Sequence, residues 1–98
     1  MKVGTDIVHV KRFMNVDDFS LRKMFHLSEL ENREPLHLAG IFAVKECCKK
    51  IFQDSDWLDF EIKKLENGKP VIHTKLDFEG DVSVSHDNEY EIDVVIKT

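Results

Sequence analysis

The sequence predicts an α+β fold in which an antiparallel sheet packs on a long central helix. Three observations support this fold class: residues 2–10 have the pattern of a strand, residues 35–50 have the pattern of a buried helix, and the residues after Gln53 alternate like strands joined by tight turns. The chain has 98 residues and is 42% hydrophobic, which suits one ordinary domain. Since it shows no internal repeat or linker, we expect residues 1–98 to form a single domain.

The first predicted strand spans residues 2–10, where β-branched residues predominate. Asp6 lies in its middle, although aspartate is disfavoured inside strands. A hydrogen bond to a nearby backbone group or hydroxyl would explain Asp6 structurally. The alternative is a functional role for its carboxylate.

A short helix is predicted from Val16 to about Phe25, with Asn15 as its N-cap. Its apolar side contains Leu21 and Met24, and a small basic surface on its outer side contains Arg22 and Lys23. Ser28 and Glu31 then have the spacing of a capping box, which predicts a further helical turn.

The central helix is predicted to begin at Glu34-Pro35, because proline suits the first helical turn. At about 100° per residue, it carries two apolar faces and should be largely buried. Glu46 falls within one of these faces, where an unpaired carboxylate would be costly. Its partner is either Lys50, one turn later, or a metal ion shared with a second carboxylate.

The remaining residues predict β structure. Residues 57–65 alternate loosely, Asn67-Gly68 is typical of a tight hairpin turn, and Pro70 opens the returning strand. Residues 81–86 alternate again, Asp87-Asn88 predicts a second turn, and the last strand covers residues 90–97. These strands should form the antiparallel sheet that packs on the central helix.

The composition excludes some functions and predicts a compartment. A net charge of -5 argues against general nucleic-acid or membrane-surface binding, which usually needs a basic excess. With no apolar run of membrane-spanning length and no leader sequence, we expect a cytoplasmic protein. Cys47 and Cys48 are adjacent, so neither an intramolecular disulfide nor a zinc site is expected, and both should be packing residues.

Three separated pieces of the sequence resemble one family. Gly4-Thr5-Asp6-Ile7-Val8 with Arg12 is similar to its amino-terminal signature, and residues 38–46 with Lys50 are similar to its central helix. Residues 67–70 and 83–86, which read Asn-Gly-Lys-Pro and Ser-Val-Ser-His, resemble its carboxy-terminal turn and strand. The pieces occur in the order found in the holo-acyl-carrier-protein synthases, the small 4′-phosphopantetheinyl transferases, and span nearly the whole chain.

The resemblance implies the 4′-phosphopantetheinyl transferase fold and its reaction. Such an enzyme moves the phosphopantetheine arm of coenzyme A to a serine of an acyl carrier protein and releases adenosine 3′,5′-bisphosphate. It also implies that Asp6 and Glu46 bind the Mg²⁺ that contacts the diphosphate of coenzyme A. Such ligands agree with the preference of Mg²⁺ for oxygen atoms, and catalysis would rest on positioning and electrostatics.

Further site residues follow from the same resemblance. Glu46, acting through a metal-bound water, is the first candidate for the base that removes the serine proton, and Lys50 is the second. Lys50 could also contact phosphate. Coenzyme A would lie near Lys69, Pro70, Ser85 and His86, although the hairpin itself needs residues such as Lys69 and Pro70, and His86 could be an ordinary residue at a strand end.

Carrier docking and assembly are also implied. The acidic carrier would meet Arg12, Arg22 and Lys23, which could otherwise be an ordinary solvated surface. A single unit of this size implies a homotrimer with coenzyme A at the subunit boundaries.

The sequence departs from the family pattern at several places. Ile41 and His9 stand where arginine and glutamate are usual, Asp93 replaces a small apolar residue, and the segment from Arg12 to Leu38 is shorter. A non-catalytic protein that keeps the fold and binds coenzyme A or a carrier is therefore the alternative function.

Overall fold

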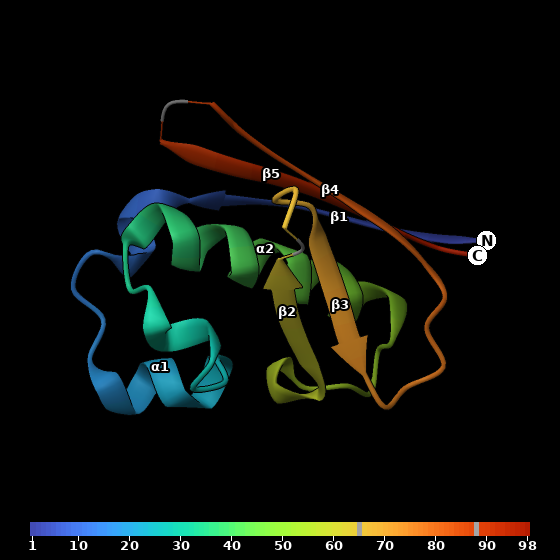
Figure 1. The fold of residues 1–98 in the computed structure, drawn as a ribbon, viewed down its shortest axis with the longest axis horizontal. Helices are drawn as coiled ribbons and strands as arrows, with labels where there is room; N and C mark the ends of the chain where they lie inside the picture. The colour runs from blue at the N-terminus through green and yellow to red at the C-terminus, as the bar shows by residue number, and fades with distance from the viewer. Residues whose placement is uncertain (65, 88) are drawn as a thin grey trace.

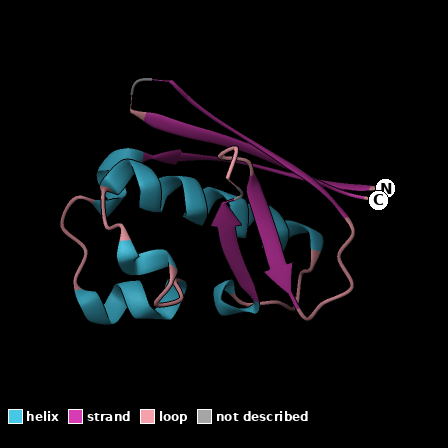
Figure 2. Cartoon of the chain, in the orientation of Figure 1, coloured by secondary structure: helices cyan, strands magenta, loops and turns pink. Residues whose placement is uncertain are grey.

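The computed structural model describes residues 1–64, 66–87 and 89–98, with only the backbone described for residues 91, 92 and 94. Figure 1 shows the long helix α2 (Pro35–Ile51) running beneath the long strands, with the short helix α1 (Asp18–Met24) on its other side. Figure 2 shows the same helices and strands by type. No helix in these residue ranges is both long and apolar enough to cross a membrane.

The strands form two antiparallel sheets, where the sequence predicted one. β1 (Lys2–His9), β5 (Tyr90–Lys97) and β4 (Gly80–Asp87) pair in the order β1-β5-β4. β2 (Phe60–Lys64) and β3 (Pro70–Thr74) form a separate hairpin that crosses α2 in Figure 1. Because β1 pairs with β5, Lys2 lies opposite Lys97 and the two termini are side by side.

Helix α2 is the centre of the core. Pro35 occupies its first turn and Glu34 its N-cap position, as predicted. The helix is buried on both predicted faces, and its buried side chains include Ala39, Phe42 and Val44. Within the three-stranded sheet, α2 lies closest to β1 and β5, and Phe60 and Ile62 of β2 belong to the same core.

Gly4 allows β1 to approach α2 closely. A Cβ atom at this position would overlap the backbone carbonyl of Cys47. Asp6 follows two residues later on the same strand face, because side chains alternate along a strand. This close approach therefore sets the position of Asp6 relative to the last turns of α2.

Several predicted boundaries were wrong. Asp17, and not Asn15, caps α1, because its carboxylate accepts a hydrogen bond from the Ser20 backbone N–H at 2.7 Å. A short 3₁₀ turn, η1 (Val10–Phe13), follows β1 directly. Ser28 makes no cap hydrogen bond to the turn η2 (Glu29–Glu31), since its hydroxyl donates to Glu61.

The carboxy-terminal half follows the predicted pattern with one change. The turn η3 (Trp57–Asp59) replaces the start of the predicted strand, because Asp56 and Asp59 form a capping box there. Gly68 has φ +84, the left-handed backbone conformation that the Asn67-Gly68 turn predicted. Leu65 and Asn88, which belong to the predicted strand 57–65 and the predicted turn 87–88, lie outside the described residues.

Candidate active site

Asp6 and Lys50 form an ion pair between β1 and the last turn of α2. Lys50 Nζ lies 3.1 Å from Asp6 Oδ1 and donates a hydrogen bond of 2.6 Å to the backbone carbonyl of Thr5. The Asp6 side chain is 19% exposed, whereas that of Lys50 is 55% exposed. The pair therefore lies at the surface, where a ligand can reach both groups.

Glu46 lies one helical turn before Lys50. It is half-buried, whereas Ala39, Phe42 and Ala43 of the same predicted face are fully buried. Of the two partners considered for Glu46, Lys50 contacts Asp6 instead, and the metal ion stays a prediction. Within the described residue ranges, no hydrogen bond or ion pair engages the Glu46 carboxylate, which leaves its oxygen atoms able to bind a ligand.

The donor atoms here suit a cation that takes few protein ligands. In the described part of the chain, no cluster of three or more His, Cys, Asp or Glu side chains could hold a metal. Two carboxylates such as Asp6 and Glu46 suit the coordination of Mg²⁺, which is commonly bound by one or two carboxylates together with phosphate and water. Lys50 also lines a cavity of about 430 Å³ together with Lys2, so two ammonium groups face this cavity next to the Asp6–Lys50 pair.

A second cavity, of about 460 Å³, lies between α2, the β2–β3 hairpin and β4. Two of the predicted coenzyme A residues, Pro70 and His86, line it together with Ile41. Ser85 does not line this cavity, because neighbouring side chains point to opposite faces of a strand. Lys69 does not line it either, since its ammonium lies 3.1 Å from the carboxylate of Asp81.

Comparison with known proteins identifies the family of this chain. No family model matches it. Holo-[acyl-carrier-protein] synthases of Bacillus cereus and Acholeplasma laidlawii are 30% and 33% identical to it, each over 96% of this chain and 92% of the relative. That of Bacillus subtilis is 35% identical over 90% of this chain and 87% of the relative. The chain belongs to the holo-[acyl-carrier-protein] synthase family.

Solved structures support the same assignment. The Helicobacter pylori holo-[acyl-carrier-protein] synthase, crystallised in complex with coenzyme A, is 27% identical and matches with a TM-score of 0.84 over 99% of this chain and all of the other. The Bacillus anthracis synthase, in complex with CoA (3′,5′-ADP), is 25% identical and also has a TM-score of 0.84, over 95% of this chain and 91% of the other. The predicted family, enzyme class and α+β fold are therefore confirmed.

In this synthase the predicted site residues fall into two groups on different sides of α2. At about 100° per residue, Glu46 is about 180° around the helix from His37 and about 140° from Ile41, and both of these residues line the larger cavity. Lys50 lies on the Glu46 side and pairs with Asp6. Pro70 and His86 therefore lie on the other side of α2 from Asp6, Glu46 and Lys50.

The three predicted docking residues of the synthase are exposed, but each already has a contact. Arg12 stacks over the ring of Phe42 at 4.9 Å, and Lys23 stacks over Phe19 at 4.3 Å. Arg22 forms an ion pair of 2.7 Å with Asp18, whose pKa is lowered mainly by its hydrogen bond with Arg33 and also by Arg22. All three cations therefore remain at the surface, each beside one neighbouring side chain.

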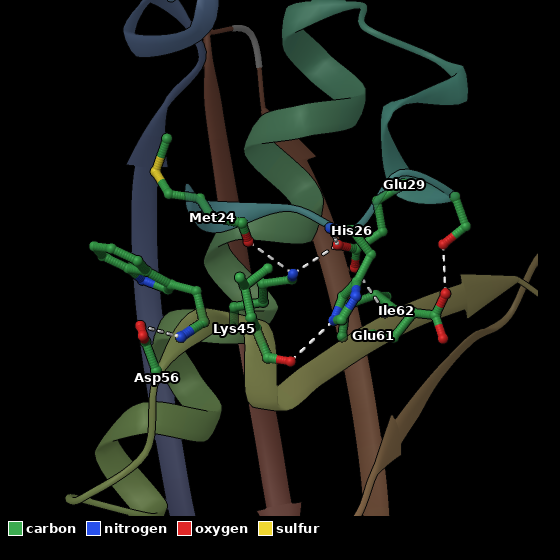
Figure 3. A network of polar contacts seen from close by, with 10 residues as sticks. Met24, His26, Glu29, Lys45, Asp56, Glu61 and Ile62 are labelled. Atoms are coloured by element: carbon green, nitrogen blue, oxygen red, sulfur yellow. Dashed lines mark hydrogen bonds and ion pairs between the residues drawn. The ribbon is translucent and has the colours of Figure 1, made fainter. Parts of the chain in front are cut away.

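Sequence reasoning missed a buried polar network next to the site (Figure 3). Lys45, the neighbour of Glu46, is fully buried, and its ammonium donates to Glu29 at 2.6 Å and to the Met24 carbonyl at 2.8 Å. The helical pattern contained a signal for this burial, since Lys45 falls between Leu38 and Ile41 when the helix is viewed along its axis. Its partner was not predictable, because Glu29 belongs to the turn η2, which is 16 residues away in the sequence.

Proposed function

We propose that this chain transfers the 4′-phosphopantetheine group of coenzyme A to a serine hydroxyl of an acyl carrier protein, and that Asp6, Glu46 and Lys50 carry the reaction. The transfer is the activity of the family to which the chain belongs. The observation that supports these residues is the convergence of β1 and α2, which brings the Asp6 carboxylate to 3.1 Å from Lys50, the residue one helical turn after Glu46.

Each of these residues would have a distinct role. Asp6 and Glu46 would hold Mg²⁺, which supplies positive charge opposite the diphosphate of coenzyme A when it is bound. Lys50 is exposed enough to contact phosphate, and Lys2 adds a second ammonium beside the same cavity. Glu46 would accept the serine proton through one water, since its carboxylate has no competing ion pair among the described residues.

A complete site would need two copies of the chain, and we propose the homotrimer. Pro70 and His86 line the larger cavity, on the side of α2 away from Glu46. A coenzyme A molecule that meets both groups would therefore bridge two subunits. The outer face of the three-stranded sheet offers an apolar surface for assembly, because Val3, Ile7 and Ile96 are 52%, 60% and 36% exposed.

The carrier would dock near α1 and the start of α2. Arg12, Arg22 and Lys23 present positive charge there on a chain whose net charge is -5. An acidic partner complements this local patch, and such charges mainly raise the encounter rate. We propose a cytoplasmic location as well, because the two buried cysteines are both free thiols, as is usual in a reducing compartment.

The proposed function is tested by incubating the protein with coenzyme A, Mg²⁺ and an apo acyl carrier protein. Mass spectrometry should show the carrier gaining one phosphopantetheine group. The variant Glu46→Gln should abolish this gain, while Asp77→Asn, a charge change on an exposed loop, should leave it intact. Coenzyme A binding without any mass gain across several carriers would instead establish the non-catalytic alternative.

A further inference from the structure

Asp93 is a buried acid to which the proposed function gives no role. Its side chain is 0% exposed, and so is that of Val95, two residues later on β5. Because side chains two residues apart share one face of a strand, both lie on the face of the sheet that packs against α2. The family pattern has a small apolar residue at this position, so the acid is a property of this chain. A carboxylate this deeply buried costs folding free energy unless positive charge or hydrogen bonds compensate it.

Asp93 lies directly opposite Asp6. The register of β1 and β5 pairs the two residues, and the Cβ atoms of directly opposite residues are about 4.5–5.5 Å apart. Both residues also face the same turn of α2. The backbone of Gly4, on the same face of β1 as Asp6, lies against the Cys47 carbonyl. The Cys47 thiol in turn donates to the backbone carbonyl of Asp93 at 3.5 Å. Two carboxylates from neighbouring strands therefore lie side by side next to Cys47, the residue that follows Glu46.

The charge at this place favours a cation. Asp6, Glu46 and Asp93 contribute three carboxylates, and Lys50 forms an ion pair of 3.1 Å with Asp6. Like charges this close raise the free energy of each other's charged forms, and a nearby cation lowers it. Because Asp93 is buried, water and salt screen its charge less than that of an exposed acid. Its field therefore attracts a divalent cation towards the two proposed ligands.

We propose that Asp93 strengthens the binding of a divalent cation by Asp6 and Glu46, so that this chain binds Mg²⁺ before coenzyme A. The proposal rests on the proposed function, which names the two ligands. Mg²⁺ that is held by one or two carboxylates usually depends on substrate phosphates as well, and the added negative charge reduces that dependence. Asp93 acts on the ion through its charge and not as a ligand, because its side chain has no exposed surface.

Calorimetry with magnesium chloride alone, without coenzyme A or carrier, tests the proposal. Asp93→Ala should raise the Kd for Mg²⁺ about tenfold, because a buried charge close to the ion is lost. Asp93→Asn keeps the shape of the side chain and should have the same effect. Asp87→Asn is the matched control, since Asp87 is an exposed acid on β4, opposite Tyr90, and should leave the Kd unchanged. Glu46→Gln should weaken the binding at least as strongly as Asp93→Ala, because it removes a ligand.

Thermal unfolding distinguishes this role from a purely structural one. A ligand that binds the folded state more tightly stabilises it more. The same concentration of Mg²⁺ should therefore raise the Tm of the wild-type protein more than that of Asp93→Ala. A change in packing would alter the Tm of the variant but would not alter its response to Mg²⁺. Equal Tm shifts for the two proteins would overturn the proposal.

The binding results also separate this proposal from the proposed function. The proposal is overturned if the wild-type protein binds no Mg²⁺ without coenzyme A, or if Asp93→Ala or Glu46→Gln binds it equally well, even when the protein transfers phosphopantetheine. If Mg²⁺ binding depends on Asp93 and Glu46 but no carrier gains mass, the proposal stands and the transferase function fails.

Discussion

Lys45 Nζ lies 2.6 Å from Glu29 Oε1, and both side chains are completely buried. The remaining polar capacity of Glu29 is also used, because its carboxylate accepts hydrogen bonds of 2.7 Å from the His26 N–H and 2.8 Å from the Ile62 N–H. Figure 3 shows this carboxylate between the loop before η2 and strand β2. The ion pair therefore joins α2, the loop and the hairpin at the residue before Glu46.

Replacing Lys45 by methionine should destabilise the fold strongly. The variant keeps the apolar stem but leaves the Glu29 charge buried without its cation, for which about 3–5 kcal/mol is typical. The double variant Lys45→Met/Glu29→Gln should recover part of this loss, because no net charge then remains buried and the glutamine carbonyl can still accept one N–H. Urea denaturation measures both values. A loss below about 1 kcal/mol for Lys45→Met would show that the pair behaves like a surface contact.

Gly4→Ala should separate β1 from α2. The new methyl group would overlap the Cys47 carbonyl, and overpacking of this kind costs about 1–3 kcal/mol or more. The variant should also lose kcat under conditions where it remains folded, because Asp6 moves with β1 while Lys50 and Glu46 stay on α2. The control Thr5→Ala changes the adjacent, exposed residue and should have little effect on the urea midpoint. Equal midpoints for the two variants would contradict the close approach.

Glu46→Gln should lower kcat by at least about 100-fold and raise the Mg²⁺ concentration needed for half-maximal activity. The amide keeps the size of the side chain but loses the charge that would hold the cation and accept the proton. Because Glu46 is half-buried and makes no ion pair among the described residues, its substitution should leave the unfolding midpoint unchanged. A large loss of stability would instead assign Glu46 a structural role.

Local sequence signals predicted the features that depend on a few neighbouring residues. Pro35 begins the central helix and Gly68 takes the left-handed turn conformation, as proline and Asn-Gly each indicated. The separate hairpin and the burial of Lys45 depend on distant partners. The hairpin is separate because β5 pairs with β1. Lys45 is buried because Glu29 of the turn η2 pairs with it. Composition and periodicity contain no information about such long-range pairs.

The candidate site shows the same division. The pattern of one strand and one helix identified Asp6 and Glu46 as unusual acids, but it offered Lys50 as a possible partner of Glu46 because both lie on one helix. The structure pairs Lys50 with Asp6, whose backbone approaches α2 at Gly4. A contact between chain segments overrides a contact within the helix, and helical spacing alone could not show this.

The two cysteines should be unreactive in the folded protein. Burial raises the pKa of both Cys47 and Cys48 from 9.0 to about 12, so at pH 8 almost no thiolate is present. A thiol reagent should label neither residue until denaturant is added. In the unfolded chain the thiols lose protons above about pH 9, whereas the folded protein retains them. The free energy of unfolding should therefore fall as the pH rises from about 9 towards 12. Rapid labelling at pH 8 without unfolding would contradict this burial.

Two inactive variants should restore activity when they share one oligomer. Glu46→Gln removes the metal half of the site, and Val84→Trp fills the larger cavity, which Val84 lines while 38% exposed. If a complete site takes one half from each of two chains, some subunit boundaries in a mixed oligomer are intact. In these, the Val84→Trp chain supplies Glu46 and the Glu46→Gln chain supplies the open cavity. Random assembly from equal amounts gives about a quarter of such boundaries, so a co-expressed mixture should recover about that share of wild-type kcat.

The control for this experiment is a mixture in which complementation is impossible. Glu46→Gln combined with Asp6→Asn removes acids from the same half-site, because Asp6 and Glu46 lie on the same side of α2 as Lys50. Every boundary in such an oligomer carries a defective metal half, and activity should stay at the level of the single variants. The contradicting outcome is an inactive mixture of Glu46→Gln with Val84→Trp in which both variants still assemble with each other. Each chain would then have to hold a complete site. In that case Asp6, Glu46 and the larger cavity would not bind the same coenzyme A molecule.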